Sequence, residues 1–177
     1  FCRAIELDPN FASAYGLAAY CYTHRKVGGW LTDREKEIAE TARLARKAAV
    51  LGRDDALALC TAGLALAYTV GDIDDGAAFI DRALVLNPNL AWAWLYGGWA
   101  KVYLGEPEAA IEREARAMRL SPQDSQVFMM HTGTAAAHYF AGRYTEASSW
   151  AEEALRENPD YLGALRYLAA SYAMTGR

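Results

Sequence analysis

The chain has 177 residues, a formal net charge of −4, 53% hydrophobic residues and 23% charged residues. This apolar content is ample for a core and excludes a disordered chain, and the scattered basic residues exclude a nucleic-acid surface built from clustered Lys and Arg. The three cysteines lack the spacing of a disulfide framework or a zinc site, and the longest uncharged run, 56–71, is too short for a membrane span. We also expect no signal peptide. We therefore expect a cytoplasmic location without membrane insertion.

The first predicted elements contain an insertion. Residues 1–9 are expected to end a second helix of a preceding repeat, and because Phe1 is not an initiator Met, we expect a fragment of a longer chain. A first helix is predicted at 10–25, followed by an inserted loop at 25–31. A long second helix at 33–51 would begin with a capping box formed by Thr32 and Glu35.

The rest of the chain alternates first and second helices. First helices are predicted at 55–70, 90–104, 123–141 and 161–175, and second helices at 73–86, 107–120 and 144–157. A recurring phrase, "AIELDP", "ALVLNP", "AMRLSP" and "ALRENP", closes the second helices, since proline cannot continue a helix. Three extra residues before Gly142 predict a longer or bulged first helix in the fourth unit.

The first helices share a register of large and small residues. Six positions after the residue that closes each second helix stands a large apolar residue, and four positions later a small one, so both lie on one helix face. The large residues are Tyr15, Leu59, Trp94, Phe128 and Leu165, and the small ones are Ala19, Gly63, Gly98, Thr132 and Ala169. We expect each large residue to fill the space left by a small one on a neighbouring helix, which places Trp94 in the core.

This unit of helix, turn, helix and proline turn, repeated every 34 to 37 residues or so, resembles the tetratricopeptide repeat (TPR). The resemblance implies an all-α, right-handed helical solenoid of about 4.5 repeats whose first helices line a concave groove. We expect one array over 1–177, with repeats at 10–53, 54–88, 89–122, 123–159 and a partial one at 160–177. The last helix would then lack a capping helix.

A second aromatic stripe is the candidate binding site. Trp92, Leu95, Trp99 and Tyr103 follow helical spacing on a face offset from Trp94, and this face should line the groove. Equivalent positions in the other repeats add Tyr20, His24, Tyr68, Met129, Tyr139 and Arg166. The alternative is that these aromatic residues fill contacts between successive repeats. Only Lys101 and Arg166 are nearby basic residues, so a basic clamp for a carboxyl terminus is disfavoured.

No motif indicates catalysis. There is no phosphate-binding loop and no nucleophile motif, and His131 and His138 lie two helical turns apart, too far for one metal ion. We therefore expect no enzyme activity, no cofactor, no catalytic residues and no metal site in this chain.

Four segments resemble the C-terminal TPR region of bacterial class III adenylate/guanylate cyclase-like proteins of the alphaproteobacterial type. They are "ARLARKAAVLGRDDALAL", "GDIDDGAAFIDRALVLNPNLAWAW", "GEPEAAIEREARAMRLSPQD" and "HTGTAAAHYFAGRYTEASSWAEEALRENP". In that family the repeats follow a cyclase domain and are thought to regulate it or to bind partners. The resemblance implies a parent protein of this kind and transfers no catalytic residue, because the cyclase motifs are absent here.

These observations together predict a non-catalytic scaffold that binds a peptide or a protein domain, such as another domain of its own parent chain. One alternative is the regulatory or sensor region of a nucleotide cyclase or another multidomain signalling protein. The other is self-assembly into a homo-oligomer through the uncapped terminal helices.

Overall fold

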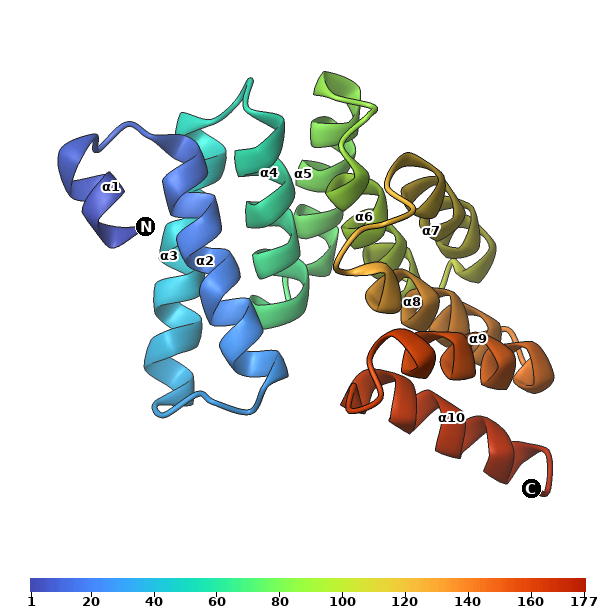
Figure 1. The fold of residues 1–177 in the computed structure, drawn as a ribbon. Helices are drawn as coiled ribbons and strands as arrows, with labels where there is room; N and C mark the ends of the chain where they lie inside the picture. The colour runs from blue at the N-terminus through green and yellow to red at the C-terminus, as the bar shows by residue number, and fades with distance from the viewer. The chain divides into compact units, whose positions relative to one another are not determined.

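A computed structural model describes residues 1–177, and all of its regular elements are helices (Figure 1). They are α1 (Cys2–Leu7), α2 (Ala12–Val27), α3 (Arg34–Leu51), α4 (Ala56–Leu64), η1 (Ala65–Val70, a π-helix), α5 (Ile73–Leu86), α6 (Ala91–Tyr103), α7 (Pro107–Leu120), α8 (Val127–Phe140), α9 (Tyr144–Glu157) and α10 (Leu162–Met174). The predicted all-α class is confirmed, and every predicted helix overlaps an observed one. The chain forms two compact units, unit 1 (Phe1–Tyr96) and unit 2 (Gly97–Arg177).

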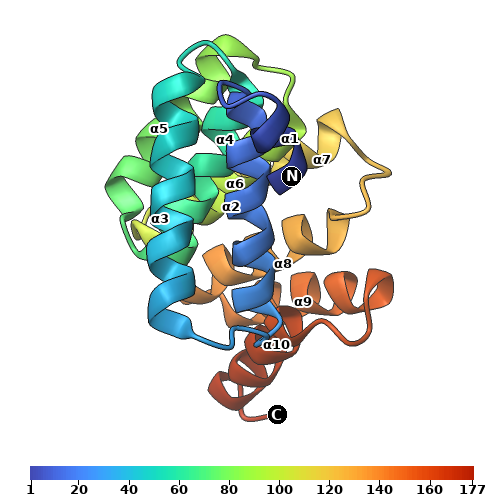
Figure 2. The same ribbon diagram turned by 90° about the vertical axis from the view of Figure 1, so that its left-hand side faces the viewer.

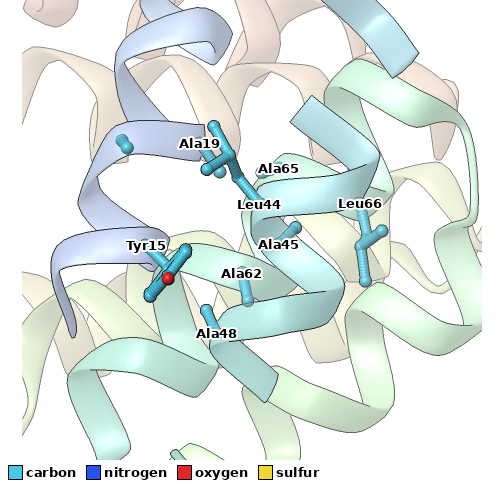
Figure 3. Close-up of a cluster of buried hydrophobic side chains, with 9 residues drawn as sticks. Tyr15, Ala19, Leu44, Ala45, Ala48, Ala62, Ala65 and Leu66 are labelled. Atoms are coloured by element: carbon cyan, nitrogen blue, oxygen red, sulfur yellow. The ribbon is translucent and has the colours of Figure 1, made fainter. Parts of the chain in front are cut away.

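Unit 1 is built from helix pairs that share a core of small residues. α2 packs against α3 and α4, and α4 packs against α5; Figure 2 shows α2 and α3 side by side. The core cluster joins Tyr15 and Leu44 to a set of buried alanines from α2, α3, α4 and η1 (Figure 3). Because alanine keeps helix axes close, the few large side chains fill most of the space between them.

Gly63 of α4 and Gly76 of α5 bring their two helices into close contact. A Cβ atom at either glycine would lie 2.6 Å from the carbonyl oxygen of the other. No side chain larger than hydrogen fits at such a distance, so the small-residue register reflects direct backbone contact between the two helices.

Two large residues of the predicted register also close the turn before their own helix. Tyr15 donates its hydroxyl hydrogen to the carbonyl oxygen of Pro9 at 3.2 Å, and Trp94 donates from Nε1 to the carbonyl oxygen of Pro88 at 2.8 Å. Trp94 is half-buried, not fully in the core as predicted, because its polar edge must reach this exposed turn. The last member of the register, Leu165, is exposed.

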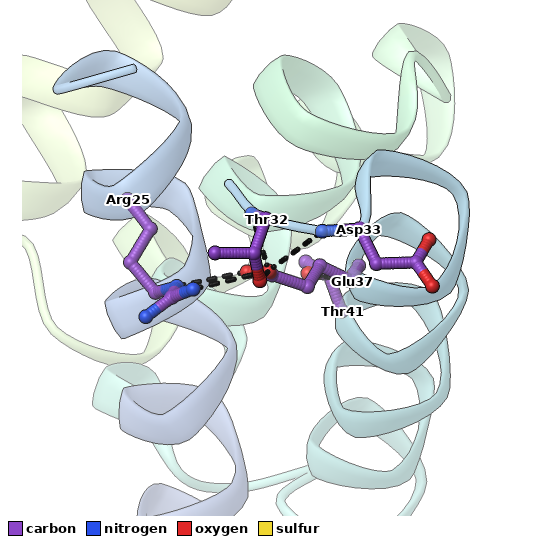
Figure 4. A network of polar contacts seen from close by, with 5 residues as sticks. All are labelled: Arg25, Thr32, Asp33, Glu37 and Thr41. Carbon is purple, nitrogen blue, oxygen red and sulfur yellow. Dashed lines mark hydrogen bonds and ion pairs between the residues drawn. The ribbon is translucent and has the colours of Figure 1, made fainter. Parts of the chain in front are cut away.

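The predicted capping box at Thr32 and Glu35 is wrong. The cap of α3 is Asp33, whose side chain accepts a hydrogen bond from the Lys36 backbone N–H at 3.1 Å. The residue that reaches back is Glu37, which accepts from the backbone N–H and the hydroxyl of Thr32, both at 2.9 Å (Figure 4). The same carboxylate binds Arg25 of α2, so one buried acid joins both ends of the inserted loop.

The first helix of the second repeat begins as α4 and continues from Ala65 as the π-helix η1. Lys26 of α2 donates from its ammonium group to the carbonyl oxygens of Tyr68 at 2.6 Å and Thr69 at 3.2 Å. The hydroxyl groups of Thr23 and Thr69 also share a hydrogen bond of 2.8 Å. These contacts satisfy polar groups at the end of the helix before Gly71 takes a positive φ of 98° and turns the chain.

Unit 2 contains the helix pairs α7–α8, α8–α9 and α9–α10, which pack in sequence. Its core cluster contains Val102, Ala110, Ala136 and Ala137, with Trp99 packed against it. The fourth first helix is not lengthened as predicted. The Asp124 carboxylate accepts a hydrogen bond from the Gln126 backbone N–H at 2.9 Å, and this turn delays the start of α8 to Val127.

Glu114 of α7 is fully buried in unit 2. Neither carboxyl oxygen has a hydrogen-bond partner, and burial raises the pKa of Glu114 well above its ordinary value. A Cβ atom added at Gly98 of α6 or at Gly133 of α8 would lie 2.3 Å from Oε1 of this acid. The carboxyl group therefore occupies space that two glycines leave open, and the buried site favours its protonated form.

None of the helices combines the length and the apolar character needed to cross a bilayer. No group of three or more His, Cys, Asp or Glu side chains is placed to hold a metal ion. None of the three cysteines is in a disulfide bond; Cys2 and Cys21 are exposed, and Cys60 of α4 is buried, which raises the pKa of its thiol.

Candidate binding surfaces

Unit 1 brings three of the predicted aromatic residues together with one that the sequence did not single out. We call Tyr20, His24, Trp92 and Tyr96 the aromatic cluster of unit 1. The Tyr20 ring is stacked on Trp92 at 5.7 Å between centroids, meets His24 edge-on at 4.4 Å, and lies 6.0 Å from Tyr96. The Tyr96 hydroxyl donates a hydrogen bond of 3.0 Å to the Tyr20 hydroxyl.

The cluster is graded from buried to exposed. Tyr96 is buried, Tyr20 and Trp92 are half-buried, and His24 is exposed. Neighbouring side chains remove part of the water around the imidazole and lower the pKa of His24, so its ring is neutral at pH 7. The result is a fixed aromatic platform with a neutral hydrogen-bonding group at its edge.

Tyr68 lies beside a charged side chain. The Lys26 ammonium nitrogen is 4.8 Å from the centroid of the Tyr68 ring, a cation–π contact, while it also binds the Tyr68 carbonyl oxygen. Burial, followed by repulsion from Arg34, lowers the pKa of Lys26. This ammonium group is held by backbone oxygens and a ring, so it is part of the structure of α2 and η1.

Unit 2 holds the predicted residues Trp99 and Tyr103, whose rings lie 6.0 Å apart. Trp99 is half-buried against the core cluster of unit 2, and its Nε1 is buried without a hydrogen-bond partner. Tyr103 is 36% exposed. Trp99 thus combines the two roles that the sequence left open, core packing on one side and surface on the other.

The remaining predicted residues lie further along unit 2. Tyr139 contacts Phe140, Tyr144 and Tyr167, all edge-on and within 6 Å. Met129 is half-buried and Arg166 is exposed. The fourth and fifth units therefore contribute one aromatic cluster around Tyr139 and, apart from it, the side chains of Met129 and Arg166.

Leu95 does not belong to any binding surface, and this prediction is wrong. Its exposed fraction is 0%. A residue at the edge of a helical stripe can face either the core or the surface. Leu95 lies between the buried residues Ala93 and Tyr96 and faces the core. Sequence reasoning also missed Tyr96; its place four positions after Trp92 was the signal that could have found it.

Comparisons with known proteins identify the fold alone. No protein-family model matches the chain, and no curated protein matches it. Solved structures do match: residues 41 to the end of MamA from Desulfovibrio magneticus RS-1 share 17% identity at a TM-score of 0.63, covering 92% of this chain and 86% of that one.

Two further solved structures agree. YrrB, described as a TPR protein with an unusual peptide-binding site, is 20% identical at a TM-score of 0.62, covering 92% of this chain and 77% of that chain. A TPR protein from Parabacteroides merdae ATCC 43184 is 16% identical at a TM-score of 0.66, covering 98% of this chain and 64% of that chain. The helix pairs described above and these likenesses together show that the chain has the TPR fold.

Proposed function

We propose that this chain is a non-catalytic interaction module that binds a peptide or a protein domain on the aromatic cluster of unit 1. The observation that carries the proposal is the stacked pair Tyr20 and Trp92, which is half-buried, so the rings are held in place yet keep an accessible side. Large, rigid aromatic side chains are the anchors of many protein interfaces because little conformational entropy is lost when they bind.

The chemistry of the surface favours an apolar or aromatic anchor on the partner. The pKa of His24 is lowered, so its ring is neutral at pH 7, and the Lys26 ammonium is engaged by the carbonyl oxygens of Tyr68 and Thr69, so neither residue offers a free positive charge to a partner. An apolar helix or an extended peptide with one or two large side chains suits such a platform. The peptide-binding site named for YrrB supports a peptide as the class of partner.

Tyr68 in unit 1 is proposed as a secondary contact. In unit 2 the proposed secondary contacts are Trp99, Tyr103, Met129, Tyr139 and Arg166. We also propose that the repeats follow the boundaries expected from the sequence, in one array. The aromatic cluster of unit 1 would supply the main anchors, and unit 2 would carry a set of contacts of its own.

The test is selection of peptides from a displayed library with the whole 177-residue chain, followed by calorimetry of the selected peptides with variants. Trp92→Ala should weaken binding at least ~10-fold, since the loss of a hot-spot anchor costs about 2 kcal/mol or more. Trp30→Ala is the matched control because Trp30 is 68% exposed in the inserted loop and outside the cluster. Circular dichroism would show whether each variant keeps its helices.

His24→Ala is a second test variant, used in case Trp92→Ala does not fold. His24 is exposed, so its side chain can be removed without opening the core. We expect it to weaken binding while stability is unchanged. If selected peptides bind Trp92→Ala and His24→Ala as tightly as the unmodified chain, the partner surface lies elsewhere and the proposal is overturned.

We further propose that the parent protein is a signalling protein of the nucleotide-cyclase type, with this module contacting another domain of that protein. The support is the sequence resemblance of the four segments. Cyclase activity of the parent with and without residues 1–177 would test it: equal activity and equal response to effectors would count against regulation.

Self-assembly is a second candidate. The observation that favours it is the exposure of large apolar residues on α8 and α10, with Phe140 at 62%, Leu162 at 59% and Met174 at 55%. Sedimentation at increasing protein concentration would decide: a rising mass supports association, and a constant monomer mass removes this candidate.

A further inference from the structure

Unit 1 holds a pocket of about 550 Å³ that shares no residue with the aromatic cluster. It is lined by side chains of α3, α4, η1 and α5 and of the turn after α3. Its floor is apolar: Leu59 is 2% exposed, Leu66 is 1% exposed, and Phe79 packs against the core cluster to which Leu66 belongs. The volume is in the range of pockets that hold small organic ligands, roughly 300 to 1,000 Å³.

Three guanidinium groups line this apolar floor. Arg46 lies on α3, Arg53 lies in the turn after α3, and Arg82 lies on α5. Arg46 donates to Asp72 at 2.5 Å and Arg82 lies 3.7 Å from Asp54, and all four side chains are well exposed. Exposed ion pairs contribute little to stability, so a bound anion can replace these aspartates at small cost.

Arg53 is the free member of the three, since it makes no ion pair or side-chain hydrogen bond. The only acid that lines the pocket is Asp75. The lining therefore carries more positive than negative charge. A guanidinium group offers two parallel N–H donors, which match the two oxygens of a carboxylate.

We propose that this pocket binds a small amphipathic carboxylate of the fatty-acid class. The alkyl chain lies over Leu59, Leu66 and Phe79, and the carboxylate is bound by Arg53 with Arg46 and Arg82 around it. The apolar floor selects the chain, and the arginines select the charge. The proposal is independent of the aromatic cluster and of any peptide that binds there.

The first experiment is calorimetric titration of the whole chain with decanoate, below its micelle concentration, and with decanol. Decanoate should bind saturably at a single site. Decanol should bind about tenfold more weakly, because it keeps the alkyl chain and loses the charge-assisted hydrogen bonds. Equal binding of the two compounds would overturn the assignment, as would the absence of saturable decanoate binding.

Variants locate the site. Arg53→Gln should weaken decanoate binding about tenfold, whereas Arg34→Gln at the start of α3 should not change it. Val50→Asp adds a negative charge to the pocket lining at a residue that is 60% exposed, and it should weaken binding by a similar factor. Its matched control is Val85→Asp, at a valine that is 72% exposed on α5 outside the pocket.

If Val50→Asp and Val85→Asp bind decanoate equally well, the ligand lies elsewhere and the proposal fails. A competing occupant is the apolar carboxyl terminus of a peptide. Titration with the N-acetylated dipeptide of two leucines, as the free acid and as the amide, tests it: tighter binding of this acid than of decanoate would overturn the fatty-acid assignment in favour of a peptide terminus.

Discussion

Arg25 binds Glu37 through two hydrogen bonds, from Nε to Oε2 at 2.8 Å and from Nη2 to Oε1 at 3.0 Å. Arg25 is in the last turn of α2 and Glu37 in the first turns of α3, so the pair joins the two helices on either side of the insertion. Thr32 binds the same carboxylate (Figure 4). The inserted loop is therefore closed at its base by a single acid.

This arrangement predicts an acid-sensitive element in unit 1. The hydrogen bonds from Arg25, followed by those from Thr32 and Asp33, lower the pKa of Glu37 to about 2. The unfolded value is about 4.3, so the stabilisation is complete above that pH and is lost as the pH falls toward 2. In urea unfolding, Glu37→Gln should be less stable than the unmodified chain at pH 6, and the difference should shrink by pH 3. A difference that is constant with pH would contradict this account.

Glu114 should have the opposite dependence. Its folded pKa is raised by burial, so the folded state keeps a proton that the unfolded state releases above about pH 4.3. The unmodified chain should lose stability as pH rises from there toward the folded pKa, at up to about 1.4 kcal/mol per pH unit. Glu114→Gln should remove this loss. The free energy of unfolding of this variant, measured in urea, should therefore rise relative to that of the unmodified chain between about pH 4.5 and about pH 7. Glu112→Gln, exposed on the same helix, is the control and should show no such trend.

The hydrogen bond between the Tyr20 and Tyr96 hydroxyl groups predicts a measurable coupling. Tyr20→Phe, Tyr96→Phe and the double variant form a cycle that isolates the pair from the other contacts of each ring. We expect a coupling energy of about 0.5 to 1.5 kcal/mol from chemical denaturation. Additive effects would mean that the two hydroxyl groups are bound to water in solution.

The contact of Gly63 with Gly76 predicts a steep cost for a single methyl group. Gly63→Ala would place Cβ 2.6 Å from the Gly76 carbonyl oxygen and should destabilise unit 1 by about 1 to 3 kcal/mol. Gly163→Ala in α10 is the comparison, because the close atoms there belong to the far end of the Tyr161 side chain and not to backbone. It should be neutral or gain up to about 1 kcal/mol from helix propensity. Equal thermal shifts for the two variants would refute the backbone contact.

The helices could be predicted from the sequence because local chemistry fixes their ends. Proline after the second helices and a left-handed glycine before them, as at Gly71, Gly105 and Gly142, act within a few residues. The small-residue register also depended only on helical spacing. The cap of α3 was missed because Thr32 and Asp33 are both good cap residues, and in the structure Asp33 caps the helix while Thr32 binds Glu37.

The candidate site was less accessible to prediction. Tyr20 and Trp92 lie two repeats apart in the sequence, and no spacing rule says that their rings stack. Leu95 shares the helical spacing of Trp92 and yet is fully buried, because helical spacing gives only an approximate direction for each side chain. Glu114 was missed as a core residue because its residue type favours the surface, although the corresponding position in the preceding repeat is the buried, apolar Ile80.

The reactivity of the Cys60 thiol can be used to measure local opening of unit 1. The buried thiol of α4 cannot react until the surrounding helices separate, whereas Cys2 and Cys21 react at once at the surface. With those two changed to serine, the rate at which a thiol reagent labels Cys60 measures how often unit 1 opens under native conditions. Comparing that rate in chains with and without Glu114→Gln would reveal whether a substitution in unit 2 changes how often unit 1 opens.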